Sequence, residues 1–346
     1  MKETLAERER RVLEVIILDY IQTAEPVGSR TVAKKLKMEL SPATIRNVMA
    51  DLEEVGLLAQ PHTSAGRVPT DRAFRYYVDS LLEIHSLNRS SRDRIETRLQ
   101  GEKLDFSEIM RRASSLLSVL SRQTGVVLAP RFGSTIFKHV EFIKLEEKKV
   151  LALIVSSMGE VQNKIIEADE AMTQDELDKY SKYLTEIMGG LTLMEAKRKI
   201  MEEMKKEKVL FDKLMYRALQ LSQKALEDEG EGNLYIEGKT NLMELPEFAD
   251  LEKIRTLLMA FEEKTKLVAL LDKALAAKGI QIFIGAENEF REMRDCTVVA
   301  ASYSKEDLAL GSLGIIGPTR MDYCSIIPLV EYTARVVGRM LKHMGS

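Results

Sequence analysis

The sequence predicts an α+β protein of several domains, with a small helical unit and a hairpin at its N-terminus. Two observations predict this class. The 346 residues correspond to about two or three domains at roughly 100–200 residues each, and helix-like periods alternate in blocks with short strand-like runs. The formal net charge is −3, so any contact with nucleic acid requires a local basic patch.

Several classes of protein are excluded by what the sequence lacks. No apolar run approaches the roughly 18–20 residues that cross a bilayer, and the charged start MKETLAERERRVLEVI is not a secretory signal, so we expect a cytoplasmic protein without membrane contact. Cys296 and Cys324 form no CxxC pair, so we expect buried, reduced thiols and no metal or cofactor. No histidine lies near a nucleophile in a recognised motif, so we assign no catalytic residue and expect no enzyme activity.

The first part of the chain predicts three helices in quick succession. Residues 5–24 carry apolar side chains at helical spacing. A short second helix is expected over 29–36, with Ser29 as its cap. The third begins at Ser41-Pro42, because serine is a preferred N-cap and proline loses nothing at the first helical position. Its apolar stripe ends at Gly56, a typical helix stop.

A hairpin and a longer helix are expected next. Residues 57–60 and 67–70 form two short strands around a polar loop, and residues 71–87 form a helix with one apolar side. Helix, helix, turn, capped helix and hairpin is the order of elements in a winged helix-turn-helix. The third helix would then lie in the DNA major groove.

Side chains on the outer face of this unit suit DNA. Arg46 can pair with guanine and Asn47 with adenine, while alanine or threonine can touch a thymine methyl group. Residues 26–75 contain eight Lys/Arg against five Asp/Glu, a local net charge of +3, so tight binding would need a dimer on two half-sites. The candidate DNA-binding residues are Arg30, Ser41, Ala43, Thr44, Arg46, Asn47, His62, Thr63, Ser64 and Arg67.

The remaining sequence predicts two mixed regions. Residues 86–104 are polar and arginine-rich, and we expect a helical linker that continues from the helix before it. The strand expected at 125–129 and those from 234 onward are predicted to share one sheet, with about 131–230 inserted between them. Further elements are expected as a helix at 106–123, strands at 136–145, 150–156 and 161–168, three helices within 173–228, helices at 249–261 and 264–277, strands at 281–284, 297–302 and 312–316, and a final helix at 323–343.

Three stretches of sequence resemble one family. LSPATIRNVMADLEEVGLLAQPHTSAGRVPTDRAFRYYVD (40–79), with the preceding YIQTAEPVGSRTVAKKL (20–36), is similar to the signature of HrcA, the bacterial heat-inducible transcription repressors. GKTNLMELPEFAD (238–250) and GSLGIIGPTRMDYCSIIPLVEYTA (311–334) resemble the same family. The resemblance spans both ends of the chain and shows no departure in the stretch predicted to read DNA.

The resemblance implies a domain plan and a function. It implies a winged helix at 1–85, the helical linker at 86–104, a GAF-like α/β domain from 105–130 and 231–346, and an inserted α+β dimerisation domain at 131–230. It also implies repression of chaperone operons through a double-stranded inverted-repeat operator bound by a homodimer. Activity would be maintained by the GroEL chaperonin and relieved on heat stress.

Some alternatives stay open. The three-helix unit could bind protein, as in a ligand-sensing enzyme or signal module, although the polar hairpin and the uncluttered face from Ser41 to Asn47 favour DNA. A GAF-like fold often binds a small molecule, but Gly311–Pro318 lacks the spacing of a phosphate loop, and we assign no ligand. Whether heat acts directly or through the chaperonin is not fixed by the sequence.

Overall fold

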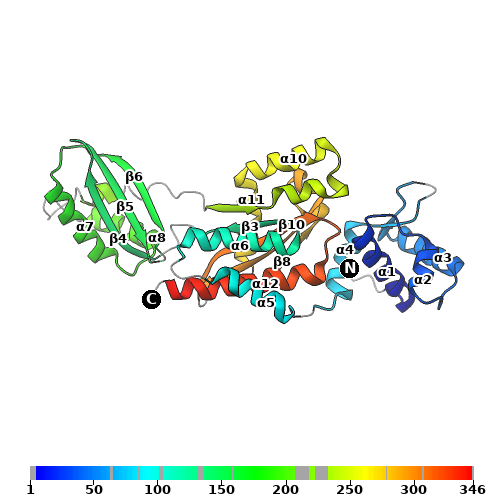
Figure 1. The fold of residues 1–346 in the computed structure, drawn as a ribbon. Coiled ribbons are helices and arrows are strands. Elements are labelled where there is room, and N and C mark those ends of the chain that lie inside the picture. Colours follow the sequence, from blue (N-terminus) through cyan, green and yellow to red (C-terminus); the bar gives the residue numbers. More distant parts are fainter. Residues whose placement is uncertain are drawn as a thin grey trace.

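The computed structural model places three bodies in a row (Figure 1). An N-terminal helical unit lies at one end, a central sheet covered by helices lies in the middle, and a second sheet with its own helices lies at the other end. The structure describes residues 5–62, 65–84, 86–100, 104–130, 136–157, 159–206, 218–222, 233–277, 279–305 and 308–344.

The N-terminal unit forms the three predicted helices and the hairpin. The apolar stripe predicted for the third helix is confirmed at Ile45, Val48, Met49 and Leu52, which are buried, but not at Val55, which is 42% exposed. The two short strands pair antiparallel, Leu58 opposite Pro69. The elements are α1 Glu7–Thr23, α2 Ser29–Lys35, α3 Pro42–Glu54, β1 Leu58–Ala59, β2 Val68–Pro69, α4 Asp71–Tyr76 and the π-helical turn η1 Tyr77–Leu81.

Three local expectations were wrong. The N-cap of α2 is Gly28 rather than Ser29. The helix expected over 71–87 ends at Leu81 in the π-helical turn, and Leu82 is extended. The helix within 86–104 does not continue from it, because Asn88 caps a new helix, α5 Arg89–Leu99, by accepting a hydrogen bond from Ser91 N. Helix α5 packs against the central body instead of linking two bodies.

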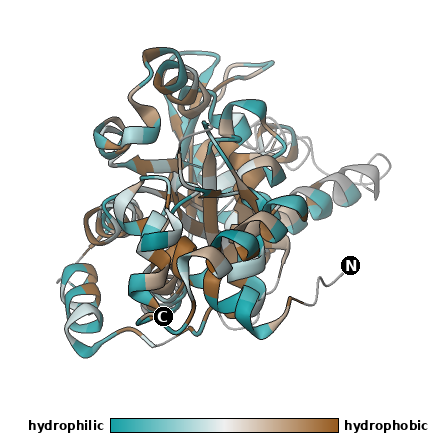
Figure 2. Cartoon of the chain, turned by 90° about the vertical axis from the view of Figure 1, so that its right-hand side faces the viewer, coloured by the Kyte–Doolittle hydropathy of each residue, from teal (hydrophilic) through white to brown (hydrophobic). Residues whose placement is uncertain are grey.

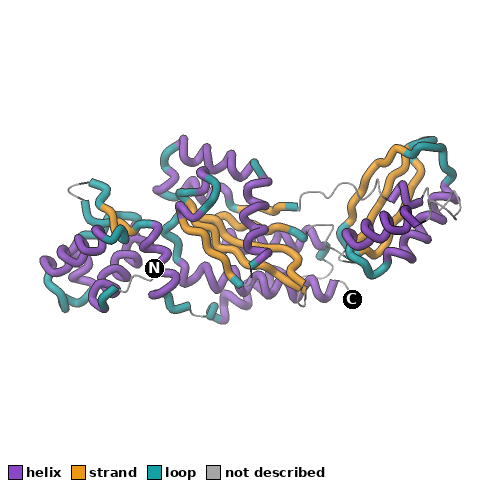
Figure 3. Tube along the Cα trace, turned by 180° about the vertical axis from the view of Figure 1, so that it is seen from behind, coloured by secondary structure: helices purple, strands orange, loops and turns teal. Residues whose placement is uncertain are grey.

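The central body is built on a five-stranded antiparallel sheet in the order β7-β3-β10-β9-β8. Strand β3 pairs with β7 although more than a hundred residues separate them, so the predicted shared sheet is confirmed. Figure 3 shows this sheet with helices on both sides. The strands are β3 Thr124–Leu128, β7 Leu234–Glu237, β8 Ile280–Ile284, β9 Cys296–Lys305 and β10 Leu308–Pro318.

Alternating side chains of these strands enter two different cores. Val127 and Val299 belong to the core shared with helices α6 and α12, whereas Val126 and Val298 belong to the core shared with α10 and α11. This alternation follows from the two-residue period of a strand. The helices are α6 Phe106–Ser121, α10 Leu251–Glu262, α11 Lys264–Ala276 and α12 Tyr323–Met344.

The chain between β3 and β7 folds around a separate core. Its three strands pair in the order β4-β5-β6, and α7 packs beside β4. Two side chains of α7 occupy edge groups of β4, since Phe142 N donates to Ser181 Oγ and Gln174 Nε2 donates to Phe142 O. The elements are β4 Phe137–Lys144, β5 Lys149–Ser156, β6 Val161–Glu167, α7 Gln174–Met188 and α8 Leu193–Lys206. Most of the third helix expected within 173–228 lies outside the described residues, apart from helical residues 218–222.

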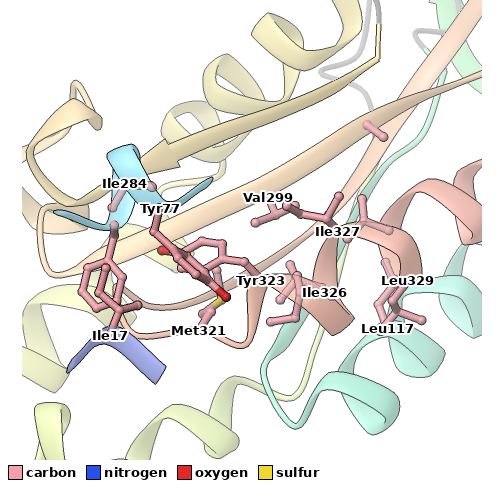
Figure 4. Close-up of a cluster of buried hydrophobic side chains, with 14 of the residues drawn as sticks. Ile17, Tyr77, Leu117, Ile284, Val299, Met321, Tyr323, Ile326, Ile327 and Leu329 are labelled. Atoms are coloured by element: carbon pink, nitrogen blue, oxygen red, sulfur yellow. The ribbon is translucent and has the colours of Figure 1, made fainter. Parts of the chain in front are cut away.

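The N-terminal unit shares a continuous core with the central body. Phe74 of α4 lies 6.1 Å from the ring of Tyr323 in α12, and Figure 4 shows Ile17, Tyr77 and Tyr323 in one cluster. Polar contacts surround this cluster. Arg75 of α4 binds both carboxylate oxygens of Glu287, and Arg320 donates to Ile21 O at 2.9 Å.

Arg75 and Glu287 form an ion pair across this interface. The hydrogen bond to Glu287 raises the pKa of Arg75. Burial opposes charge on Glu287, but the guanidinium of Arg75 and the N–H of Ile284 outweigh it and hold the pKa of Glu287 below its usual value. Both groups are therefore ionised at neutral pH and fix α4 against the segment that follows β8.

The structure also bears on the two cysteines, on membrane spans and on metal sites. Cys296 is buried, but Cys324 is exposed, so the expectation of two buried thiols was half wrong. No helix within the described residues is long and apolar enough to cross a membrane. Among the same residues, no group of three or more His, Cys, Asp or Glu side chains could hold a metal ion.

Candidate DNA-binding surface

The start of α3 is organised by its capping residue. Ser41 Oγ accepts a hydrogen bond from Thr44 N at 3.1 Å, and Pro42 occupies the first helical position, as predicted. The Ser41 and Thr44 hydroxyl groups also bond to each other at 2.9 Å. The first turn of α3 has no acidic residue, so the positive end of the helix dipole is available to an anion such as phosphate.

The outer face of α3 carries the side chains predicted to read bases. Ser41, Ala43, Arg46 and Asn47 are exposed, and Thr44 is half-buried. Within the described part of the chain, neither Arg46 nor Asn47 has a recorded hydrogen-bond or ion-pair partner. The structure therefore brings these five predicted residues together on one surface, with the two base-reading candidates adjacent.

The helix that carries this face lies at the end of the molecule farthest from the second sheet (Figure 1). In Figure 1, α2 and α3 lie at the far end of the N-terminal unit, and α4 lies between them and the central body. Figure 2, which looks onto this end, shows hydrophilic segments on the helices nearest the viewer. A partner of the size of a DNA duplex can thus approach α3 without displacing another element of this chain.

Helix α2 adds positive charge beside α3. Arg30 and Lys34 are exposed, and so is Lys37 in the turn between the helices, where φ is +51°. Other charges nearby are paired within the unit, since Lys35 binds Asp19 at 2.5 Å and Arg11 binds Glu39 at 2.6 Å. Lys34 and Lys37 were counted in the basic patch but not named as site residues, because charge alone gave no reason to select them.

The hairpin is held against α3 by Arg67. Its Nε and Nη2 atoms lie 2.9 and 2.8 Å from Glu53 Oε2, and only 20% of the Arg67 side chain is exposed. Its backbone exchanges two hydrogen bonds of 2.9 Å with Val27. A side chain on Gly66 would meet the Val27 carbonyl oxygen at 2.4 Å, so only glycine permits this close approach.

The tip of the hairpin carries the other predicted contacts. His62 is exposed, and Gln60 Nε2 donates to Ala65 O across the loop at 3.2 Å. Thr63 and Ser64 lie outside the described residues. The structure thus places His62 on the exposed loop, while Arg67 lies behind it and binds a carboxylate of the same unit.

Comparison with known proteins identifies the family. A family model described as "Winged helix-turn-helix transcription repressor, HrcA DNA-binding" matches residues 4–80, and one described as "HrcA protein C terminal domain" matches residues 107–327. The chain belongs to the HrcA family. The winged helix predicted from the order of elements is confirmed, and because HrcA proteins are transcription repressors, the family is one of regulators and not of enzymes.

Individual HrcA proteins match along the whole chain. The protein "Heat-inducible transcription repressor HrcA" of Geobacter sulfurreducens is 51% identical over 338 residues, which cover 98% of each chain. Its namesake in Syntrophobacter fumaroxidans is 45% identical over 344 residues and 99% of each chain. A crystal structure of a hypothetical protein has the same fold, with a TM-score of 0.65 and 24% identity over 99% of this chain and 100% of that one.

Proposed function

We propose that this protein represses transcription of heat-shock chaperone operons by binding an inverted-repeat operator as a homodimer. The observation that carries the proposal is the exposed face of α3, where Arg46 and Asn47 have no recorded partner among the described residues. Family membership and the winged-helix match support DNA as the partner. Relatives bear the name of heat-inducible transcription repressor, which supports the physiological role.

Each exposed residue of α3 would contact the part of the DNA that suits its chemistry. Arg46 would make a bidentate contact with guanine and Asn47 with adenine, while Ala43 and Thr44 would touch thymine methyl groups. The free N–H groups beyond Ser41 would bind a phosphate. Positioning contacts to the DNA backbone would come from Arg30, Lys34 and Lys37 and from the hairpin tip at His62, Thr63 and Ser64. Arg67, also a candidate contact, would act through the position of the hairpin as long as Glu53 holds it.

Arg46→Ala is the direct test of base reading. The variant should lose about 1–3 kcal/mol of binding free energy on the operator and little on a scrambled duplex, because a bidentate base contact discriminates by that amount. Fluorescence anisotropy at one fixed salt concentration measures both. Arg111→Ala, which removes another exposed arginine from α6, is the control. Equal operator affinity in the two variants would remove Arg46 from the proposed site.

We assign dimerisation to the segment between β3 and β7. We assign the five-stranded sheet β7-β3-β10-β9-β8 to a GAF-like domain. One face of the β4-β5-β6 sheet supports the first assignment. Val161 and Ile165 of β6 are 59% and 62% exposed, and they lie opposite Val155 and Leu151 of β5, which are only half-buried. We name this surface the open sheet face. Contiguous exposed apolar surface marks a protein contact, and a twofold dimer would present two copies of α3 to the two half-sites.

A double variant tests this surface without altering the core. Val161→Asp with Ile165→Asp should convert the dimer to a monomer, because two charges per protomer would be buried at the interface without partners. The mass in solution, measured by light scattering, gives the oligomeric state. Lys182→Asp introduces an acid at an exposed position of α7 and serves as the control. A double variant that remains dimeric would move the interface elsewhere.

The proposed control by GroEL rests on the family resemblance alone. Operator binding should recover after a heat pulse when the chaperonin and ATP are present, and recover less without them. The measurement is the fraction of active protein from anisotropy titration before and after the pulse. The same recovery with and without chaperonin would favour direct sensing of temperature by the protein.

A further inference from the structure

A cavity of about 690 Å³ lies between the central sheet, α12 and the segment that leaves the N-terminal unit. Its volume falls within the roughly 300–1,000 Å³ that is typical of small-molecule sites. Ile280 and Ile282 of β8 line one side, and Ile327 and Ala334 of α12 line another. Val78 of η1 and the exposed Ile84 close the side toward the N-terminal unit.

The lining is apolar within and cationic at one side. Tyr303 in the floor turns its hydroxyl group away to Leu128 O, to which it donates at 2.8 Å. Arg335, Arg339 and Lys342 of α12 all line the cavity and repeat at helical spacing, so they form one row about 10 Å long. Among the described lining residues Glu331 is the acidic one, and Glu96 outside the lining pairs with Arg339, so the three cations of the row outnumber the two carboxylates beside them.

The two arginines of this row form only solvent-exposed ion pairs. Arg335 binds Glu331 at 3.1 Å and Arg339 binds Glu96 at 2.9 Å, and their side chains are 61% and 58% exposed. Exposed ion pairs of this kind contribute little stability, so an incoming anion can compete for the guanidinium groups. A second protein strand is a poorer occupant, because Arg75 and Gln281 already donate to the edge carbonyl oxygens of Ile282 and Ile280.

We propose that this cavity binds a long-chain carboxylate. The hydrocarbon chain lies against the apolar side chains of β8 and α12, and the carboxylate lies at the row formed by Arg335, Arg339 and Lys342. Val78 and Ile84 belong to the segment that connects the N-terminal unit to α5. The ligand therefore touches both sides of the interface between that unit and the central body, and it stabilises the docked arrangement by binding to it.

A chain-length series on the full protein tests the apolar part. Isothermal titration with octanoate, decanoate and dodecanoate, each below its micelle concentration, should show affinity rising about fourfold for each added methylene group. 1-Decanol should bind more weakly than decanoate, and a decyltrimethylammonium ion should be rejected by the row of cations. Affinity that is independent of chain length, or equal for the cationic and anionic amphiphiles, would overturn the proposal.

Two variants locate the site. Arg335→Glu with Arg339→Glu reverses the head-group charge at exposed positions and should weaken dodecanoate binding about tenfold or more. Ile84→Glu places an acid at the exposed wall and should also weaken it. Arg111→Glu, a charge reversal of a comparably exposed arginine outside the cavity, should bind as the wild type does. Wild-type affinity in both cavity variants would place the ligand elsewhere and sink the assignment.

Discussion

The arginines of the N-terminal unit fall into two groups. Arg30 and Arg46 are exposed without a recorded partner in the described part of the chain, whereas Arg67 and Arg75 each bind a carboxylate. The local charge of +3 counts all four alike, so it does not show where the DNA-facing charge lies. The carboxylate partners show where this charge lies, because the arginines without one, Arg30 and Arg46, are on α2 and the N-terminal half of α3.

Glu160 gives a residue-scale prediction that involves no DNA. It precedes β6, and its Oε2 atom is buried without a recorded partner among the described residues. Burial raises the pKa of Glu160 to about 7. The folded state therefore binds a proton more tightly than the unfolded chain, and stability from this group is present at low pH and lost as pH rises from about 4.5 to 7.

Glu160→Gln should thus raise the free energy of unfolding at pH 8. The gain should be about 1–2 kcal/mol, after allowance for the partial exposure of the side chain, and it should vanish near pH 4.5. Urea titration at several pH values measures it, with the exposed Glu186→Gln as the comparison. An unchanged pH profile in Glu160→Gln would show that the carboxylate is solvated or paired in solution.

At the scale of single elements, Ser41 both caps α3 and lies on the exposed face that we propose to bind DNA. Ser41→Ala should cost about 1 kcal/mol of unfolding free energy, because Thr44 N loses its acceptor. Ser41→Asn should cost much less, since asparagine caps equally well. Chemical denaturation of both variants gives the comparison, and a Ser41→Ala protein as stable as Ser41→Asn would contradict the role of the cap.

The elements were predictable where their signals are local. The serine cap of α3, its glycine stop and the first four positions of its apolar stripe all depend on neighbours in sequence, and the structure confirms them. The helix expected over 71–87 was drawn too long because Leu81 and Leu82 continue the apolar pattern. In the structure they pack against the shared core that includes the central body, and one-dimensional periodicity cannot distinguish that from a longer helix.

The candidate site was predictable only in part for the same reason. Exposed side chains of α3 follow from helical geometry, and the structure places them as expected. The partner of Arg67 could not be predicted, since Glu53 lies fourteen residues away on another element. The cavity beside α12 is lined by side chains that are spread between residues 78 and 342. No local sequence pattern predicts that such distant residues come together.

At the scale of the whole molecule, the contact between α4 and the central body is the feature that constrains α3. Arg75→Gln should lower the free energy of unfolding by about 1 kcal/mol, because the partly exposed Glu287 loses the charged partner that binds both of its carboxylate oxygens. The variant should also lose stability less steeply in acid. Glu287, with its lowered pKa, stabilises the wild type above its usual pKa and loses this contribution as pH falls.

Scanning calorimetry at several pH values tests this prediction. Arg111→Gln, which breaks an exposed ion pair on α6, should stay within about 0.5 kcal/mol of the wild type. In Arg75→Gln, we expect the N-terminal unit to melt before the central body. A single transition at the wild-type temperature would show that the apolar cluster around Phe74 and Tyr323 holds the two bodies together alone.

The shared core also limits how such repressors can be recombined. A chimera that exchanged only residues 1–70 would keep Phe74, Arg75 and Tyr77 but replace Ile17 and Ile21, which contact or adjoin the same cluster. Exchange of operator preference between relatives should therefore be attempted by grafting the outward residues of α3, because the inward half of the unit is matched to the body that carries it.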